Sequence, residues 1–215
     1  MAQWMRMAVA ALAAAVLPAA ALADRGAFTL EAGPRLSALR LDPEVGTGPA
    51  VAGTNAGVDV RLRYGLSNGL ELTGAFGWTA PADYAHDGVT IVTENGTFVG
   101  QLQGQLSSYE VLVGARWVNG LVLRWFVGLE AGAAMTSFTG LDLVDTARPG
   151  GPASFGLGLS NKSALQLVVA PQAGLEWAIT DHWSLSVAPR LEWFVGAPSA
   201  LALTVPLTVG YSWYR

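Results

Sequence analysis

The feature that most restricts the fold is a strict alternation of apolar and polar side chains in which the charges fall on one side only. Around the turn at residues 65–69, the apolar positions 62, 64, 70, 72, 76 and 78 alternate with Arg61, Arg63, Glu71 and other polar or small residues. Alternation with a period of two is typical of a strand whose two faces meet different surroundings. The sequence therefore predicts an all-β fold with one charged and one apolar face.

The same alternation recurs in eight segments, each about as long as the 9–11 residues that a tilted strand needs to cross a bilayer. They are residues 28–36, 56–64, 70–78, 109–117, 121–131, 165–177, 183–195 and 201–214. Short connections at 65–69, 118–120 and 180–182 alternate with long ones at 37–55, 79–108 and 132–164, and a fourth at 196–200 is brief. This order predicts a closed antiparallel up-and-down barrel of eight strands, with both termini periplasmic and the long loops extracellular.

The polar face decides which side of the barrel is inside. Its charged residues are Glu31, Arg35, Asp59, Arg61, Arg63, Glu71, Glu110, Arg116, Arg124, Glu130, Glu176, Arg190 and Glu192. Mostly Gly, Ala, Ser, Thr and Gln lie between them. An eight-stranded barrel has a lumen just wide enough to be filled by side chains, so it holds these residues but not dozens of Leu, Val and Trp side chains. We therefore expect a lumen charge network inside and an apolar belt that faces lipid.

Two other arrangements are compatible with part of this pattern. A soluble lipocalin-like barrel would turn the apolar face inward, but its outer face would then need bulky charged residues, and the polar face here is mostly small. A ten-stranded barrel would place an extra hairpin in the wall, formed by residues 89–92 and 97–99 around Asn95-Gly96. Strands that project beyond the membrane would instead offer a β edge able to pair with another strand.

Composition supports export to a membrane. The chain is 52% hydrophobic and 13% charged and has no cysteine, which excludes disulfides and thiolate metal sites. Residues 1–23 have the basic start, the apolar run and the small Ala21-Leu22-Ala23 end of a cleaved secretory signal peptide. Residues 24–215 then form the barrel, and any crossing must be made by strands. The net charge of −4 gives no sign of nucleic-acid binding.

Tryptophans and prolines mark the strands in different ways. An aromatic girdle at the two membrane interfaces is predicted from the tryptophans near strand ends, Trp78, Trp117, Trp125, Trp177, Trp183, Trp193 and Trp213. Pro171, Pro189 and Pro206 fall inside strands, where each removes a ladder hydrogen bond, so bulges or kinks are predicted there.

The mature chain resembles the small eight-stranded outer-membrane β-barrel proteins of Gram-negative bacteria, the porin-like and outer membrane protein A-like barrels. Its C-terminus carries the polar, glycine and aromatic residues of their insertion signal at Thr208, Gly210 and Trp213, while Arg215 replaces the final aromatic residue. The resemblance implies the cell outer membrane as location, outer-membrane lipid as surroundings and the barrel assembly machinery as a partner during insertion.

Function is less constrained than fold. His182 lies two residues before Ser184, and His86 precedes Asp87 in a long loop. Both histidines are more simply explained as turn or solvated loop residues than as catalytic bases, so no catalytic residue, cofactor or metal is predicted. The leading hypothesis is a non-enzymatic barrel that serves envelope structure or binds a surface ligand through its loops. A narrow channel for small solutes or ions and a lipid-modifying enzyme are the alternatives.

Overall fold

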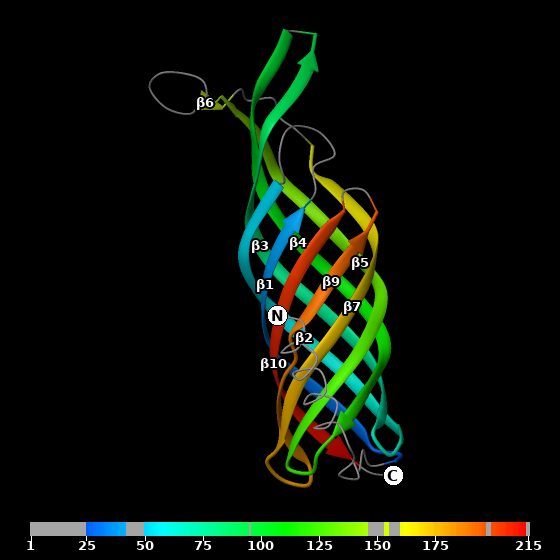
Figure 1. Cartoon of the computed structure of the whole chain (residues 1–215). Coiled ribbons are helices and arrows are strands. Elements are labelled where there is room, and N and C mark those ends of the chain that lie inside the picture. The colour runs from blue at the N-terminus through cyan, green and yellow to red at the C-terminus, as the bar shows by residue number, and fades with distance from the viewer. Residues whose placement is uncertain are drawn as a thin grey trace, which may run out of the picture.

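The computed structural model describes residues 25–41, 50–94, 96–145, 153–154, 160–196 and 199–213. Its strands are β1 (Phe28–Leu41), β2 (Ala50–Ser67), β3 (Leu70–Thr93), β4 (Gly96–Asn119), β5 (Leu123–Asp145), β6 (Ala153–Ser154), β7 (Lys162–Ala178), β8 (Trp183–Val187), β9 (Arg190–Val195) and β10 (Ala200–Trp213). They form a tall barrel of tilted antiparallel strands (Figure 1). Among the described residues, no helix is long and apolar enough to cross a membrane.

The ring contains eight strands, as predicted. β1 pairs with both β2 and β10, which closes the barrel. β8 and β9 pair with the same two neighbours, β7 and β10, and are two parts of one interrupted strand. The two-residue β6 pairs only with the outer end of β5. The ten-stranded alternative is therefore wrong: the extra hairpin lengthens β3 and β4 and adds no strand to the wall.

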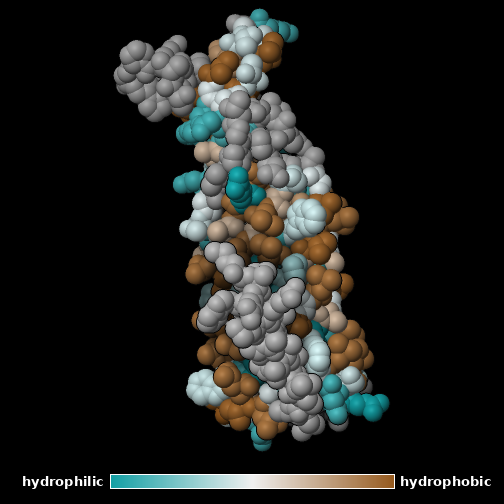
Figure 2. All heavy atoms as spheres, viewed as in Figure 1, coloured by the Kyte–Doolittle hydropathy of each residue, from teal (hydrophilic) through white to brown (hydrophobic). Residues whose placement is uncertain are grey.

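The two faces of each strand lie as the alternation predicts. Leucine, valine and tryptophan side chains of all eight wall strands are exposed on the outside, with exposed fractions such as 64% for Val113 and 66% for Leu167. The predicted charged residues are turned into the barrel, where all are buried except Arg124, which is half-buried with a side chain 21% exposed. Figure 2 shows apolar residues gathered over the barrel wall. An apolar outer surface of this extent is stable in lipid and not in water, so the chain is a transmembrane barrel.

β3 and β4 are much longer than predicted. Each has 24 residues, and they pair without a long loop up to Thr93 and Gly96. The prediction of a long connection over 79–108 is thus wrong, because the pairing continues through irregularities between Thr79 and Ala82 and between His86 and Val89. These shifts break the alternation from which strand length was judged. The paired ends project beyond the rest of the barrel (Figure 1).

The turn between β4 and β5 also differs from its prediction. β4 continues through Asn119 and β5 begins at Leu123, so the connection is residues 120–122 and not 118–120. Gly120 has a φ of 115°, which an L side chain rarely adopts. Arg116 and Arg124 nevertheless face the same side, as required, since both are turned inward.

Pro189 and Pro206 interrupt hydrogen bonding without shifting the register. The N–H of Ala173 donates to the carbonyl of Pro189 at 3.1 Å, and the N–H of Ala188 donates to the carbonyl of Pro206 at 3.3 Å. The return bond of each antiparallel pair cannot form, because proline has no N–H. The wall strand therefore breaks at residues 188–189 between β8 and β9. Of the predicted bulges or kinks, no bulge forms at these two positions, since no extra residue is inserted and the ladder is interrupted instead.

Pro171 also interrupts the hydrogen-bond ladder without shifting the register. It pairs in register with Leu129 of β5, while the ladder between β7 and β9 lacks a bridge between Val169 and Gln172. A break on one side replaces the predicted bulge. The three prolines thus lie in neighbouring wall strands, where each removes one donor from the ladder.

Several predictions lie outside the described residues. They concern the signal peptide, the loop residues 42–49, 146–152 and 155–159, and the C-terminal Tyr214 and Arg215.

Candidate functional site: the lumen and the projecting ribbon

The lumen charge network consists of two clusters. The lower cluster lies toward the end with the short turns at 68–69, 120–122 and 179–182, which we call the periplasmic end. Its six members, from β1, β2, β3, β4, β5 and β7, are Glu31, Arg63, Glu71, Arg116, Arg124 and Glu176. Arg63 Nη2 lies 2.8 Å from Glu31 Oε1, and its Nη1 lies 3.0 Å from Glu71 Oε2, so Arg63 and Glu71 form an ion pair across the first turn.

Glu176 joins the three arginines of the lower cluster. Its Oε2 lies 2.8 Å from Arg63 Nη1 and 2.7 Å from Arg116 Nη2, and its Oε1 lies 3.5 Å from Arg124 Nη1. The side chain of Glu176 is 2% exposed. Three acids face three arginines, so the lower cluster is electrically balanced.

The upper cluster lies closer to the middle of the barrel. Its seven members are Arg35, Asp59, Arg61, Glu110, Glu130, Arg190 and Glu192. Arg190 is its hub, with Nη2 2.8 Å from Asp59 Oδ2 and Nε 2.6 Å from Glu192 Oε1. Arg35 pairs closely with Glu110. Four acids face three arginines, so this cluster carries one negative charge in excess.

Glu130 is the most weakly held acid of the upper cluster. Its Oε2 lies 3.4 Å from Arg61 Nη2 and 3.6 Å from Arg190 Nη1. Its Oε1 is buried without a hydrogen-bond partner among the described residues. A buried carboxylate must be compensated to be stable, and Glu130 is compensated least.

An aromatic ring lies beside the lower cluster. The guanidinium carbon of Arg116 is 4.3 Å from the centroid of the Phe126 ring, a distance at which a cation and a ring attract each other. Phe126 packs with Val118 and Ala188 in a small buried apolar cluster. Within the described chain, no ion pair joins the lower cluster to the upper one.

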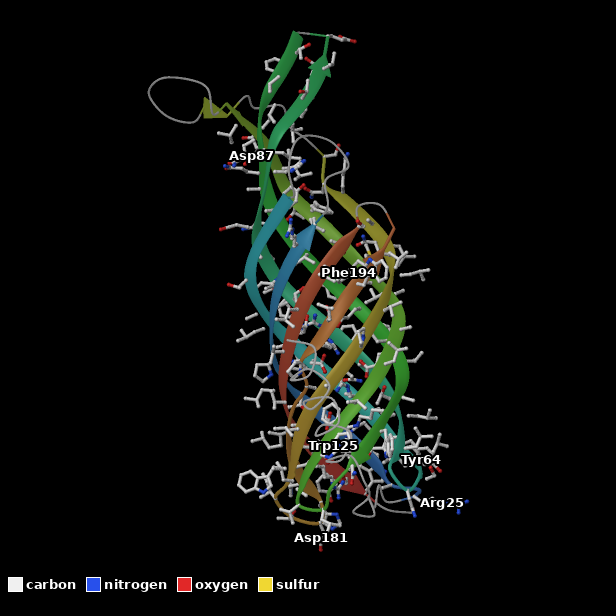
Figure 3. All side chains as sticks on the ribbon, in the orientation of Figure 1. Arg25, Tyr64, Asp87, Trp125, Asp181 and Phe194 are labelled. Atoms are coloured by element: carbon white, nitrogen blue, oxygen red, sulfur yellow. The ribbon has the colours of Figure 1, made fainter. Side chains whose placement is uncertain are left out.

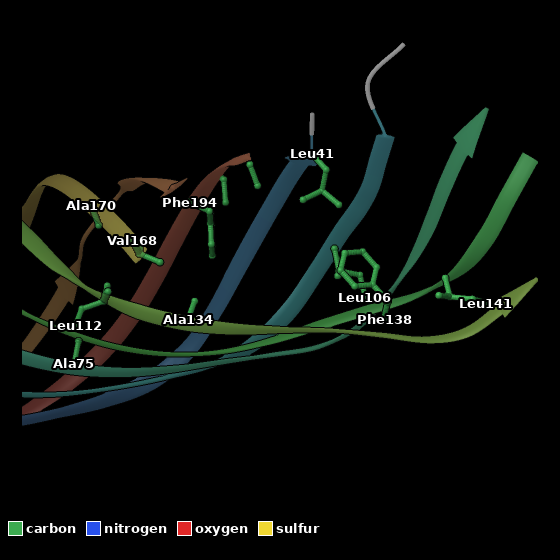
Figure 4. Close-up of a cluster of buried hydrophobic side chains, with 12 residues drawn as sticks. Leu41, Ala75, Leu106, Leu112, Ala134, Phe138, Leu141, Val168, Ala170 and Phe194 are labelled. Carbon is green, nitrogen blue, oxygen red and sulfur yellow. The ribbon is translucent and has the colours of Figure 1, made fainter. Parts of the chain in front are cut away.

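The extracellular part of the lumen is apolar, which the sequence reasoning missed. A buried cluster there includes Leu41, Leu106, Phe138, Phe194 and Val168 (Figure 4). Tyr84 packs edge-on against Phe138, with their ring centroids 5.2 Å apart. The signal was present, since Phe194 shares the inward face of Glu192, two positions earlier in the chain. This apolar cluster lies in the lumen together with the two ion clusters and with buried polar side chains such as Gln166 and Thr204.

Among the described residues, the periplasmic mouth holds a small polar hollow. Its lining includes Thr29, Arg124, Glu176, His182 and Ser184, and its volume is about 30 Å³. That is room for a few water molecules and not for a substrate.

The two histidines lie in different surroundings. His182 Nδ1 lies 3.0 Å from the carbonyl oxygen of Ser212, and its ring lies 5.7 Å from that of Tyr211. Ser184, in contrast, is buried inside the barrel. His86 is also buried, against the expectation of a solvated loop, because β3 continues through it. Its neighbour Asp87 is exposed and accepts a hydrogen bond from Gln101 Nε2 at 2.6 Å.

The predicted girdle residues lie on the outside of the wall near both ends. Trp117, Trp125, Trp177, Trp183 and Trp213 are next to the periplasmic turns or the end of β10, and Trp78 and Trp193 lie farther along their strands. Trp213 stacks on Phe28 across the closure, with ring centroids 5.9 Å apart. Of the other insertion-signal residues, Thr208 pairs with Ser186 and Gly210 with Glu31.

The projecting ends of β3 and β4 form a ribbon, residues 86–102, whose outermost part has no third strand paired to it among the described residues. On the β2 side, pairing stops at Ala85, and on the β5 side it stops at Gln101. Beyond these points each strand pairs only with the other, within the described residues. One face of this ribbon exposes Val92 and Val99, with exposed fractions of 75% and 56%. Figure 3 shows Asp87 near the base of the ribbon, at the end opposite Arg25 and Asp181.

The charge of this end is negative. The exposed or half-exposed acids on the outer parts of β3 and β5 and at the ribbon tip are Asp83, Asp87, Glu94 and Asp142. Residues 79–106 contain no lysine or arginine. No group of three or more potential metal ligands occurs in the described part of the chain.

Comparisons with known proteins identify the fold. No protein-family model matches the sequence, and no curated protein matches it. Among solved structures, the chain is similar to Ail, the attachment invasion locus protein of Yersinia pestis, with 17% identity over 88% of this chain and 99% of Ail and a TM-score of 0.54. Ail has also been crystallised with the heparin analogue sucrose octasulfate.

Two further barrels show the same likeness. The outer membrane protein OprG of Pseudomonas aeruginosa is 13% identical over 89% of this chain and 97% of OprG, with a TM-score of 0.55. Neisserial surface protein A is 12% identical over 87% of this chain and 99% of that protein, with a TM-score of 0.51. The closed ring, the apolar belt and these similarities give one conclusion: the chain has the fold of the small eight-stranded bacterial outer-membrane barrels.

Proposed function

We propose that this protein is a non-enzymatic barrel of the outer membrane that presents the β3–β4 ribbon to a partner outside the cell. In this proposal, residues 1–23 direct export, the assembly machinery inserts the barrel, and outer-membrane lipid surrounds its belt. The observation that carries the proposal is the length of β3 and β4, whose 24 residues are about twice what a membrane-crossing strand requires.

The side chains in the lumen favour a rigid scaffold for the ribbon over a channel. Both ion clusters are buried, with side-chain exposed fractions of 0–3% for Arg35, Arg61, Arg63, Arg116 and Arg190. Beyond them toward the extracellular end lies the apolar cluster. Moving charges out of such pairs costs several kcal/mol per ion, so the filled lumen opposes passage of solutes.

The ribbon offers the chemistry of strand addition. Free backbone N–H and C=O groups along an edge accept an extended peptide, and the side chains of the exposed face select it. Here that face carries Val92 and Val99, and acids lie at the tip and near the base. The ribbon thus favours an extended partner segment that is neutral or basic and rich in β-forming residues. The sucrose octasulfate bound to Ail is a polyanion, and the acids of this ribbon would repel such a ligand.

Trimming the ribbon tests this proposal. Residues 87–101 are replaced by an Asn-Gly turn, because His86 and Leu102 face each other in the register and a two-residue turn closes such a pair. The trimmed and full-length barrels are applied to an array of short synthetic peptides that range from acidic to basic composition. We expect the full-length barrel to retain basic β-prone peptides and the trimmed barrel to lose them, while both keep heat-modifiable gel migration. Equal binding by the two, or a preference for acidic peptides, would refute the proposal.

A further inference from the structure

Within the described part of the chain, the outer wall carries an unpaired cation at the extracellular edge of its apolar belt. Arg40 lies near the end of β1 and is exposed. It belongs to the outward-facing set of β1, which below it contains Leu30 and Leu36. Among the described residues no ion pair to Arg40 exists, whereas the arginines of the lumen are all paired.

The neighbours of Arg40 form a shallow hollow on the wall. Arg40 is opposite Leu201 of β10, and Leu201 is opposite Trp193 of β9. These three residues and Ala200 line a hollow of about 440 Å³. Trp193 and Leu201 are exposed, with exposed fractions of 57% and 46%. A cation, an aromatic ring and an aliphatic surface therefore meet at one place outside the barrel.

The height of the hollow along the barrel indicates which part of a lipid molecule can reach it. Leu203 and Leu36 lie on the outer face below it and are exposed by 52% and 65%, as residues in contact with acyl chains would be. Arg40 is twelve residues beyond Phe28, which stacks on Trp213 at the periplasmic end. This is about 40 Å along the strand and, for strands tilted by about 40°, about 30 Å along the membrane normal, which equals the thickness of the hydrocarbon. The headgroup layer of a leaflet is about 5–8 Å thick outside the hydrocarbon. Arg40 thus stands at headgroup level.

The chemistry of the hollow favours a phosphate group. A guanidinium donates paired hydrogen bonds to phosphate oxygens in a planar fork, and a tryptophan ring is well suited to the boundary between acyl chains and headgroups. Among the described residues, no acid lines the hollow to compete for Arg40. We propose that Arg40 and Trp193 form a binding site for the phosphate-bearing headgroup of an outer-leaflet lipid, whose acyl chains run over Leu201, Leu203 and Leu36. The site rests on the outer-membrane setting proposed above, but not on the ribbon.

Native mass spectrometry of the detergent-solubilised, full-length barrel tests the site with diphosphorylated lipid A as the probe. Arg40→Gln is compared with Lys162→Gln, which removes an exposed cation at the start of β7, at the same end of the barrel. Charge-assisted hydrogen bonds contribute about 1.5–3 kcal/mol, so we expect Arg40→Gln to weaken lipid retention about tenfold or more. Lys162→Gln and the ribbon-trimmed barrel should retain the lipid like the original protein.

Chemical variants of the probe identify the group that is recognised. Dephosphorylated lipid A should be retained as weakly by the original protein as lipid A is by Arg40→Gln. Inorganic phosphate should not displace lipid A, since it lacks the acyl chains that contact Leu201 and Leu203. Equal retention of phosphorylated and dephosphorylated lipid, equal effects of Arg40→Gln and Lys162→Gln, or displacement by inorganic phosphate would overturn the proposal. Loss of retention in the trimmed barrel alone would instead place the lipid on the ribbon.

Discussion

Replacing Glu176 with glutamine is expected to lower the free energy of unfolding of the barrel by about 3–5 kcal/mol. Glu176 contacts all three arginines of the lower cluster, Arg63, Arg116 and Arg124. Without its charge, the two remaining acids, Glu31 and Glu71, face three arginines in a buried lumen. One positive charge is then left uncompensated, and an uncompensated buried charge is far more costly than a complete pair is stabilising.

Glu130→Gln provides the matched control, because it makes the same chemical change in the upper cluster. That cluster has four acids and three arginines, and the contacts of Glu130 are the longer ones of 3.4 and 3.6 Å. Its neutralisation brings the cluster to balance, so we expect a change below about 1 kcal/mol. Urea unfolding in lipid vesicles at neutral pH measures both variants. Equal destabilisation by the two would show that charge balance does not govern the lumen.

Gly77→Val is the second substitution with a large expected effect. Gly77 on β3 faces the lumen, and a Cβ atom there would overlap Arg35 Nη1 and the carboxylate of Glu110. Both side chains are 2% exposed and are held in the upper cluster, so they have no free space in which to retreat. Valine would separate this ion pair, and we expect a loss of at least about 3 kcal/mol, as when a buried pair is broken.

Gly74→Val places the same side chain three residues earlier on the same strand. A Cβ at Gly74 meets no atom within 4 Å, because this position faces outward. Valine is also favourable in strands and in contact with lipid, so Gly74→Val should leave stability unchanged or raise it. The two variants are compared by the temperature at which the folded band disappears in heat-modifiable gel migration. If the folded band of Gly77→Val disappears at the same temperature as that of the original protein, the side chains in the lumen are less tightly packed than described.

The division into two faces could be predicted because it depends on local alternation alone. Glu110 and Arg116 on β4, for example, are separated by an even number of residues, and both are found inside. A closed ring follows from eight such strands, because a strand that is apolar outward cannot leave an edge unpaired in lipid. These properties do not require knowledge of distant contacts.

The lengths of the strands and the continuity of their backbone pairing could not be predicted from local alternation. The alternation of β3 is lost at Thr79 and again at His86, where the register shifts, so the sequence suggested a loop although backbone pairing continues. Leu121 and Val122 look like the start of a strand, yet they form the turn and are each exposed by 62%. Their apolar character reflects their place at the membrane edge and not membership of a strand.

The composition of the upper lumen was missed for a different reason. Leu112 and Phe194 are on the inward face next to acids, but the charged neighbours dominated the interpretation of that face. The ion clusters themselves depend on which strands lie opposite each other across the bore. Arg190 and Asp59, for instance, are 131 residues apart in the chain and 2.8 Å apart in space. Partners at such separation follow only from the closed structure.

The central claim is that exposed apolar residues of the wall face lipid, while those of the ribbon face water. Three exposed valines allow a direct test, since Val111 and Val113 lie on the wall and Val92 lies near the ribbon tip. The chain has no cysteine, so single cysteines at these positions carry a nitroxide label without background. In lipid vesicles, the account predicts high accessibility to oxygen and low accessibility to a water-soluble nickel chelate at 111 and 113, and the reverse at 92. Ready access of the nickel chelate to labels at 111 and 113 would contradict it.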